Sequence, residues 1–151
     1  MSNPTVIAVV VAWNRAQLLR ETLDGLASQT RPLDGVVVVD NASSDETPQL
    51  IASHPVVTNV VTLPQNYGGA GGFAAGIARA MTLGADLVWI MDDDTIPTPT
   101  ALEVLLRTRE EYPGVPAVLA CRADWIDGRE HPMNAPRERF LISRQLREHA
   151  A

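Results

Sequence analysis

Short apolar runs alternate along the chain with segments in which apolar residues recur at helical spacing. The runs at residues 6–11 and 36–39 carry no polar side chain and are rich in β-branched residues. Such runs are typical of strands that are buried on both faces of a parallel sheet. The pattern predicts further strands over residues 56–63, 86–91 and 115–120.

Helical spacing follows the first two runs. After the first strand, one apolar face is formed by Leu18, Leu19, Thr22, Leu23 and Leu26. Asn14 is the expected N-cap of this helix, with Gln17 as its capping-box partner three residues later. Ser43 and Glu46 form the same pattern before a short second helix. Strands and helices that alternate with short connections predict a parallel sheet with right-handed crossovers.

A glycine-rich segment, residues 64–72, opens a third predicted helix. The apolar side of that helix is expected to comprise Phe73, Ile77, Ala80 and Met81, with Gly84 as its C-terminal stop. Glycine lets backbone N–H groups approach a phosphate, and a helix N-terminus favours anions. Close packing of a small-residue helix on the sheet explains the same glycines, so both interpretations stay open.

Two further local patterns lie in the second half of the chain. A fourth helix is predicted to be capped by Thr98, with Pro99 at its first position. Asp127-Gly128 predicts a hairpin turn.

Composition narrows the class of protein. The chain has 151 residues, 46% of them hydrophobic and 20% charged, which is an ordinary balance for one globular domain. A net charge of −6 without a basic patch argues against nucleic acid as a partner. The single cysteine excludes an internal disulfide and a cysteine-based zinc cluster. No basic, signal-like start and no long apolar stretch are present, so we expect a cytoplasmic protein.

The strongest candidate chemistry lies where the fourth strand ends. Residues 86–91 run directly into Asp92, Asp93 and Asp94. Ligands of open α/β sheets bind at the carboxyl ends of strands, and three adjacent carboxylates repel one another unless a cation lies among them. Because Mg²⁺ and Mn²⁺ prefer carboxylate oxygens and bridge to phosphates, the cluster predicts a metal–diphosphate site at the end of a central strand. A solvated acidic turn is the alternative.

A dinucleotide-binding motif competes for the same region. Residues 69–74 satisfy the pattern G-x-G-x-x-G/A. The match is weak, since this fingerprint belongs directly after the first strand of a βαβ unit and here it follows the third. We therefore do not expect an NAD-type dehydrogenase.

Four segments, taken in order, resemble one known family. Their sequences are Trp13-Asn14-Arg15, Val39-Asp40-Asn41-Ala42-Ser43-Ser44-Asp45, Asn66-Tyr67-Gly68-Gly69-Ala70-Gly71-Gly72 and Met91-Asp92-Asp93-Asp94. Together they resemble glycosyltransferase family 2, closest to bacterial galactofuranosyl- and rhamnosyltransferase-like members, over residues 5–133. The resemblance implies an α/β GT-A fold: a Rossmann-like, nucleotide-binding, three-layer α/β/α arrangement with a mainly parallel sheet.

The resemblance also implies roles for residues at the first two strand ends. Ala12, Trp13 and Arg15 match the segment that holds the nucleotide base, although the usual Thr-Tyr-Asn-Arg pattern has lost its first hydroxyl here. Trp13 either stacks on the base or is a core tryptophan. Asp40 matches the acid that accepts a hydrogen bond from uracil, and a helix cap is the alternative role.

The other two segments match the diphosphate and sugar side of the family's site. Asn66, Gly69 and Gly71 match the loop beside the nucleotide and sugar. Asp92 and Asp94 match the D-x-D pair, which holds a divalent metal, Mg²⁺ or Mn²⁺, on the diphosphate. Asp92 and Asp93 are expected to contact the ribose or the donor sugar.

The function implied is an inverting, metal-dependent glycosyltransferase that moves a sugar from a UDP- or dTDP-sugar to a glycan or polyprenyl-linked acceptor. Residues 1–133 are the expected donor-binding half, and the charged residues 134–151 the start of a missing acceptor half. The catalytic base is then expected downstream of Ala151. Action at the inner face of the cell membrane is implied, with peripheral membrane contact and homo-oligomerisation left open. The alternatives are a non-catalytic donor-binding remnant or assembly module and, less favoured, a nucleotidyltransferase.

Overall fold

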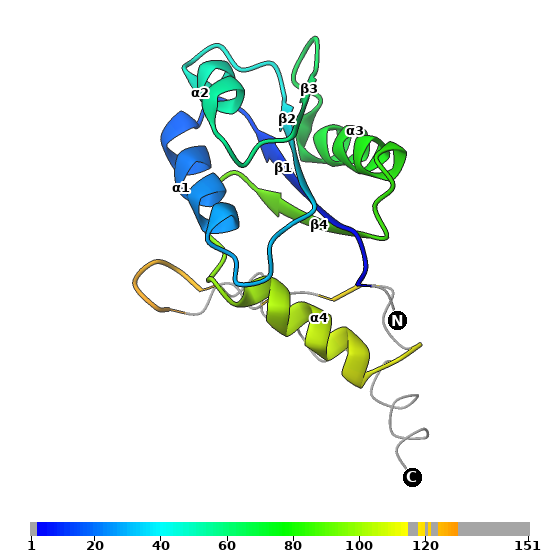
Figure 1. Cartoon of the computed structure of the whole chain (residues 1–151). Coiled ribbons are helices and arrows are strands. Elements are labelled where there is room, and N and C mark those ends of the chain that lie inside the picture. Colours follow the sequence, from blue (N-terminus) through cyan, green and yellow to red (C-terminus); the bar gives the residue numbers. More distant parts are fainter. Residues whose placement is uncertain (1–2, 115–117, 120, 122–123, 130–151) are drawn as a thin grey trace, which may run out of the picture. The chain divides into compact units, whose positions relative to one another are not determined.

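A computed structural model describes residues 3–114, 118–119, 121 and 124–129 (Figure 1). The chain divides into two compact units, Met1–Arg107 and Thr108–Ala151, and the sheet lies in the first. The described elements are, in order, β1 (Val6–Ala12), α1 (Ala16–Ala27), β2 (Gly35–Asp40), α2 (Thr47–Ser53), β3 (Asn59–Thr62), α3 (Gly68–Thr82), β4 (Leu87–Asp92) and α4 (Ala101–Glu111).

The described strands form one parallel sheet in the order β3-β2-β1-β4. Every residue of β1 and β2 is buried, as their continuous apolar runs predict. The register pairs Ala12 with Asp40 and Val11 with Asp92, so three strands end at the same edge of the sheet. The predicted parallel α/β architecture is therefore confirmed.

Helices cover both faces of the sheet and make three layers (Figure 1). On one face, α1 and α2 bury leucine and isoleucine side chains against alternate residues of β1 and β2, including Val10 and Val38. On the other face, α3 packs against the intervening residues, including Val9 and Val39. Alternate residues of a strand point to opposite faces, so each central strand contributes to both cores.

The glycines of α3 allow that helix to approach β1 closely. A Cβ atom on Gly76 would lie 2.3 Å from Cγ1 of Val9, and one on Gly72 would lie 2.5 Å from Cγ1 of Val11. Gly72, Gly76 and Ala80 are the buried residues of α3. Met81 was predicted on the apolar side of this helix but is exposed. Close packing thus accounts for two glycines, and Gly84, with φ of +83°, confirms the predicted stop.

The outer strands are less buried than predicted. β3 is confined to Asn59–Thr62, where half-buried and exposed residues alternate, rather than spanning residues 56–63. β4 lies at the edge of the described sheet rather than at its centre, and Ile90 is 49% exposed. Within the described sheet, β3 and β4 each have one paired neighbour, and such strands bury less side-chain area than β1 or β2. The apolar run alone does not reveal this difference.

The capping predictions were wrong for both early helices. α1 begins at Ala16, Arg15 precedes it without a side-chain cap, and Asn14 adopts φ of 53°. α2 begins at Thr47, after Glu46, also without the predicted side-chain cap. Leu18, expected on the buried face of α1, is exposed.

The later predictions have mixed outcomes. α4 begins at Ala101 rather than at Pro99, and the carbonyl of Thr98, the predicted cap, accepts a hydrogen bond from the backbone N of Ala101. The turn at Asp127-Gly128 is present, with the backbone N of Trp125 donating to the carbonyl of Arg129 at 2.7 Å. Residues 115–117 and 120 of the fifth predicted strand, and the tail from residue 134, lie outside the described residues. No helix among the described residues has the length and apolarity to span a membrane.

Candidate functional site

The predicted site residues gather where β2, β1 and β4 end. The parallel register places Asp40 beside Ala12, and Asp92 beside Val11 on the opposite side of β1. Neighbouring strands lie about 4.8 Å apart, so the carboxylates that end β2 and β4 flank the last residues of β1. This edge is where open α/β sheets bind their ligands.

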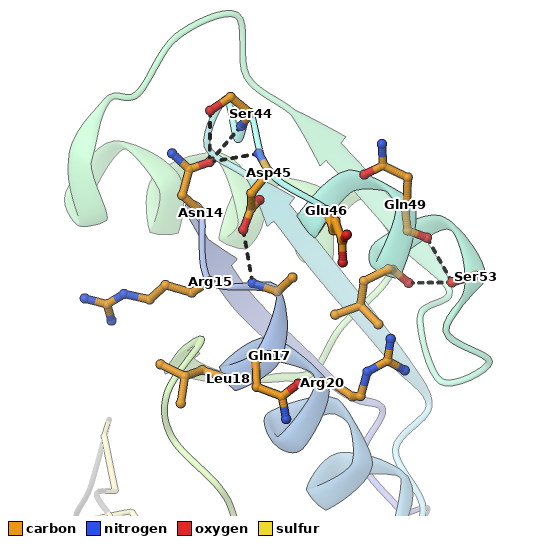
Figure 2. A pocket seen from close by; sticks show the side chains of 12 residues that line it. Asn14, Arg15, Gln17, Leu18, Arg20, Ser44, Asp45, Glu46, Gln49 and Ser53 are labelled. Carbon is orange, nitrogen blue, oxygen red and sulfur yellow. Dashed lines mark hydrogen bonds between the residues drawn. The ribbon is translucent and has the colours of Figure 1, made fainter.

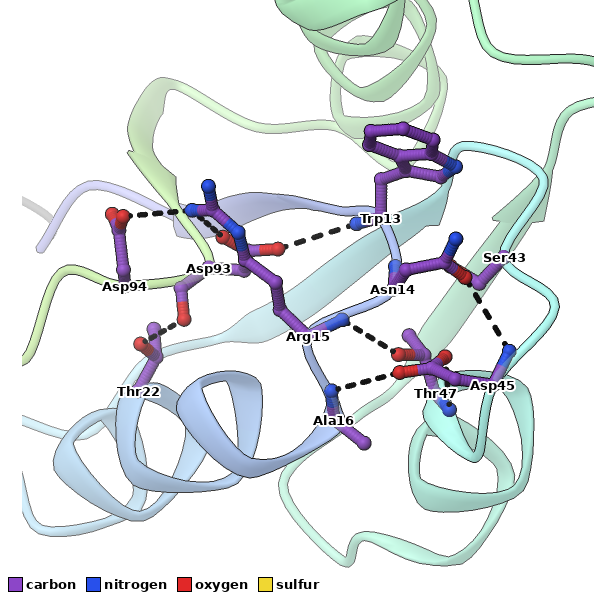
Figure 3. Close-up of polar contacts among 10 residues, drawn as sticks. All are labelled: Trp13, Asn14, Arg15, Ala16, Thr22, Ser43, Asp45, Thr47, Asp93 and Asp94. Carbon is purple, nitrogen blue, oxygen red and sulfur yellow. Dashed lines mark hydrogen bonds and ion pairs between the residues drawn. The ribbon is translucent and has the colours of Figure 1, made fainter.

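Asp93 ties the acidic turn, residues 92–94, to the end of β1 (Figure 3). Its Oδ2 accepts a hydrogen bond from the backbone N of Trp13 at 3.2 Å, and its carbonyl accepts one from Oγ1 of Thr22 at 2.9 Å. The residue is only 5% exposed. Burial raises the pKa of its carboxyl, against the opposing effects of the Trp13 N–H and the Arg15 charge.

Arg15 supplies a cation to the acidic turn from within the chain. Its Nη1 lies 2.9 Å from Oδ2 of Asp94 and 3.4 Å from Oδ1 of Asp93 (Figure 3). Three adjacent carboxylates predicted a cation among them, in the form of a metal ion. The structure shows that Arg15 partners two of the three.

Asp92 and Asp94 remain suited to a divalent metal. Burial raises the pKa of Asp92, and the charge of Asp94 raises it further, so a cation shared by the two carboxylates would relieve both effects. Among the described residues no group of three or more His, Cys, Asp or Glu could hold a metal alone. Two carboxylates still fit Mg²⁺ or Mn²⁺, which are commonly bound by one or two protein carboxylates together with substrate phosphates.

Asp40 ends β2 and is buried. Its Oδ1 accepts a hydrogen bond from the backbone N of Ser43 at 2.9 Å. This bond closes the turn after β2 and lies four residues before α2 begins, so Asp40 is not a helix cap. The bond leaves acceptor capacity on the carboxylate, which has two oxygens.

Asn41 joins the end of β2 to the glycine-rich segment. Its Nδ2 donates to Oδ1 of Asn66 at 2.9 Å and to the carbonyl of Gly68 at 3.1 Å, and its Oδ1 accepts from the backbone N of Tyr67 at 2.9 Å. The side chain is buried, and no role was predicted for it from the sequence. Its place directly after a strand-ending aspartate was the available signal.

The turns after β1 and β2 also hold each other (Figure 3). Oδ1 of Asn14 accepts hydrogen bonds from the backbone N of Ser44 at 2.7 Å and of Asp45 at 3.3 Å. In return, Oδ2 of Asp45 accepts from the backbone N of Ala16 at 3.3 Å, and Oγ1 of Thr47 accepts from that of Arg15 at 3.3 Å. The start of α1 is therefore capped by residues about thirty positions away.

Two exposed aromatic side chains lie beside these turns. Trp13 is 50% exposed directly after β1, and Tyr67 is 51% exposed next to Asn66. Of the two roles left open for Trp13, the exposure excludes a core tryptophan. Flat, exposed rings of this kind can stack on a nucleotide base.

An open groove lies beside the β1–α1 turn, where side chains of α1 and α2 face it (Figure 2). It is lined by Asn14, Arg15, Ala16, Gln17, Leu18, Arg20, Ser44, Asp45, Glu46, Gln49, Leu50 and Ser53. Neither Asp40 nor the acidic turn lines it. The candidate site is therefore the strand-end cluster and not this groove.

Comparisons with known proteins agree with this architecture. The model of the family described as Glycosyl transferase family 2 matches residues 7–150. The galactofuranosyltransferase GlfT1 of Mycobacterium tuberculosis is 41% identical over 111 residues, which cover 72% of this chain and 36% of that protein. The chain thus spans about a third of the length of the curated relatives it matches.

Solved glycosyltransferases share the fold. The chain resembles Staphylococcus aureus TarS 1–349 in complex with UDP-GlcNAc, with a TM-score of 0.63 and 25% identity over 71% of this chain and 31% of that one. It also resembles the mannosyltransferase PcManGT from Pyrobaculum calidifontis in complex with GDP-Man and Mn²⁺, with a TM-score of 0.54 and 32% identity over 62% of this chain and 28% of that one. The GT-A fold predicted from the sequence is confirmed.

Proposed function

The chain belongs to glycosyltransferase family 2, and we propose that it forms the donor-binding part of a metal-dependent, inverting glycosyltransferase that uses a UDP- or dTDP-sugar. The observation that carries this proposal is the anchoring of Asp93 to Trp13. That contact holds the acidic turn against the end of β1, and Asp40 of β2 lies on the other side of that strand end.

Each predicted residue receives a role in this proposal. Trp13 stacks on the base, which Ala12 and Arg15 border, and Asp40 accepts a hydrogen bond from the base. The glycine-rich segment, through Asn66, Gly69 and Gly71, borders the ribose and the sugar. Gly69 suits this role because a Cβ there would meet only Phe73, at 4.0 Å, so packing does not explain that glycine.

The acidic turn combines two different tasks. Asp92 and Asp94 are the proposed ligands of Mg²⁺ or Mn²⁺, and Asp92 also borders the ribose. The oxygens of Asp93 are already bonded to Trp13 and Arg15, so we assign it a positioning role rather than the sugar contact expected from the sequence. Asp93 then holds its two neighbours at the sheet edge.

The chemistry follows from the charge that develops on the donor. Breaking the bond between the anomeric carbon and the diphosphate leaves negative charge on the nucleoside diphosphate. A divalent metal supplies a Lewis acid for that charge when it is bound. The guanidinium of Arg15 and the backbone N–H groups at the start of α3 add positive charge at the same edge.

Acceptor activation is assigned to no described residue. Inversion requires a general base opposite the leaving group, and the prediction that this base lies downstream of Ala151 stays a prediction. The acceptor, a glycan or polyprenyl-linked sugar, and action at the inner membrane face stay predictions as well. The relatives named as galactofuranosyltransferases make a UDP-galactofuranose donor the first to test.

The test is consumption of sugar nucleotides followed by chromatography in the presence of Mn²⁺, with a panel of UDP-, dTDP- and GDP-sugars. We expect metal-dependent consumption of one donor class, its loss in Asp94→Asn, and its retention in Asp127→Asn, whose carboxylate pairs with Arg129. Binding without any turnover would favour the donor-binding remnant. Pyrophosphate release from a nucleoside triphosphate and a sugar phosphate would instead identify a nucleotidyltransferase.

A further inference from the structure

Arg15 forms an ion pair with Asp94, one of the two carboxylates that the proposed function assigns to the metal. Its Nη1 lies 2.9 Å from Oδ2 of Asp94. A guanidinium stays charged at any physiological pH, so it cannot yield this place by losing a proton. A divalent cation at Asp94 therefore meets a like charge until the Arg15 side chain moves.

The surroundings of Arg15 allow that movement while the backbone stays fixed. The backbone N of Arg15 donates to Thr47 and its carbonyl accepts from the backbone N of Leu19 at 3.0 Å. The side chains of Arg15 and Asp94 are 52% and 47% exposed, whereas that of Asp93 is 7% exposed and bonded to Trp13. The contact between Arg15 and Asp94 is thus the exchangeable part of an otherwise anchored cluster.

A diphosphate offers Arg15 a replacement partner. The planar fork of a guanidinium matches phosphate oxygens with two parallel hydrogen bonds. Arg15 stands at the strand edge where the proposed function places the donor's diphosphate. It can therefore leave Asp94 without losing an anionic partner, but only when the nucleotide is present.

We propose that Arg15 is an exchangeable counter-ion: it pairs with Asp94 in the free protein and with the diphosphate in the loaded protein, so that metal and nucleotide bind cooperatively. This inference rests on the proposed function. Without nucleotide, Arg15 competes with the metal for Asp94 and weakens metal binding. With nucleotide, it supports the complex, and the coupling acts equally in both directions.

If Arg15 has this role, its removal should change metal binding and UDP binding in opposite directions. A purely structural role does not predict this. Replacing Arg15 by glutamine removes the competing charge and the diphosphate contact together. Metal binding without nucleotide should then become tighter, and UDP binding with saturating metal should become weaker. Damage to the fold of the turn would weaken both.

The test measures Mn²⁺ binding without nucleotide from the electron paramagnetic resonance signal of free Mn²⁺, and UDP binding in saturating Mn²⁺ by calorimetry. For Arg15→Gln we expect Mn²⁺ affinity to rise and UDP affinity to fall, each by about fivefold or more, the lower end of typical couplings between sites. Arg15→Lys keeps the charge but not the fork, so it should bind Mn²⁺ like the wild type and bind UDP more weakly. Arg20→Gln, the same charge change at a position within α1, should match the wild type in both.

Thermal melts confirm that each variant folds. Wild-type binding of Mn²⁺ too weak to measure, against measurable binding by Arg15→Gln, counts as the expected result. Unchanged, weaker or unmeasurable Mn²⁺ binding by Arg15→Gln, or an equal gain in Arg20→Gln, overturns the inference. If the wild type binds Mn²⁺ and UDP through Asp94 while Arg15→Gln behaves like it, only this inference fails. If the wild type does not bind UDP, the proposed function fails as well.

Discussion

Oδ2 of Asp93 accepts a hydrogen bond from the backbone N of Trp13 at 3.2 Å, although the two residues are 80 positions apart. The contact joins the end of β4 to the end of β1. It turns one of three consecutive carboxylates inward and leaves its neighbours at the sheet edge. The geometry of the candidate site therefore depends on a residue whose own oxygens are already bonded.

The first prediction concerns this anchor. Asp93→Asn keeps an oxygen that can accept from the Trp13 N–H, and it removes a charge whose burial is unfavourable. Asp93→Leu removes the acceptor and should cost about 1–2 kcal/mol more in the free energy of unfolding, measured by urea titration. Equal stability of the two variants would show that the Trp13 contact does not hold the turn.

The three consecutive aspartates of the acidic turn have different surroundings, which the sequence did not predict. The run predicted a strand that ends in carboxylates, and this much is confirmed. It did not distinguish Asp93, which is buried, from Asp94, which pairs with Arg15 at the surface. Asp93 and Asp94 differ because the turn after β1 supplies the Trp13 N–H to one and the Arg15 guanidinium to the other. Which carboxylate meets which partner depends on how β1 and β4 pair.

The predictions of helix caps were wrong for a related reason. Capping rules look for partners within three or four residues. Here the backbone N–H of Ala16 donates a hydrogen bond to Asp45, and that of Arg15 donates to Thr47. Both bonds join the turns that follow two neighbouring parallel strands. The central strands were predictable because burial on both faces leaves continuous apolar runs, whereas contacts between turns leave no local pattern.

The second prediction separates packing glycines from ligand glycines. Gly76→Ala places a Cβ 2.3 Å from Val9 and 2.9 Å from Val39, and should destabilise the protein by about 1–3 kcal/mol through overpacking. Gly69→Ala meets only Phe73 at 4.0 Å and should leave the stability equal or higher. Urea unfolding measures both. We further expect Gly69→Ala to weaken UDP binding, and a normal UDP affinity would remove this glycine from the site.

The third prediction uses a backbone conformation. Ala42 adopts φ of 64°, in the left-handed region that disfavours residues with a Cβ. Ala42→Gly should raise the melting temperature, with a gain of about 1 kcal/mol in the free energy of unfolding. The same substitution at Ala78, an exposed position within α3, should cost about 0.5–1 kcal/mol. A loss at both positions would mean that Ala42 is not strained.

The fourth prediction concerns pH. A hydrogen bond from the Thr47 hydroxyl lowers the pKa of Asp45 below its ordinary value of 3.8. Burial opposes this effect, and the N–H groups of Thr47 and Ala16 lower the pKa further, each by less than burial raises it. A lowered folded pKa adds stability that is present above the unfolded pKa and is lost as pH falls through the folded one.

Asp45→Asn should therefore be less stable than the wild type at pH 7, and the difference should shrink as the pH falls below 3.8. Urea unfolding between pH 2.5 and pH 7 at about 0.1 M salt measures this difference. Asp127→Asn, in the exposed turn near residue 128, serves as the matched control. A difference that is constant with pH would show that the charge of Asp45 plays no part.

The central claim is that the carboxylates of the acidic turn join metal to a nucleotide diphosphate, and calorimetric titration of UDP with and without Mn²⁺ tests it most directly. The account predicts that Mn²⁺ strengthens UDP binding by at least about tenfold, equivalent to about 1.4 kcal/mol, in the wild type. Asp92→Ala and Asp94→Ala should lose this enhancement, whereas Asp127→Ala should keep it. UDP binding that is indifferent to Mn²⁺, or an enhancement that survives both substitutions in the acidic turn, would contradict the account.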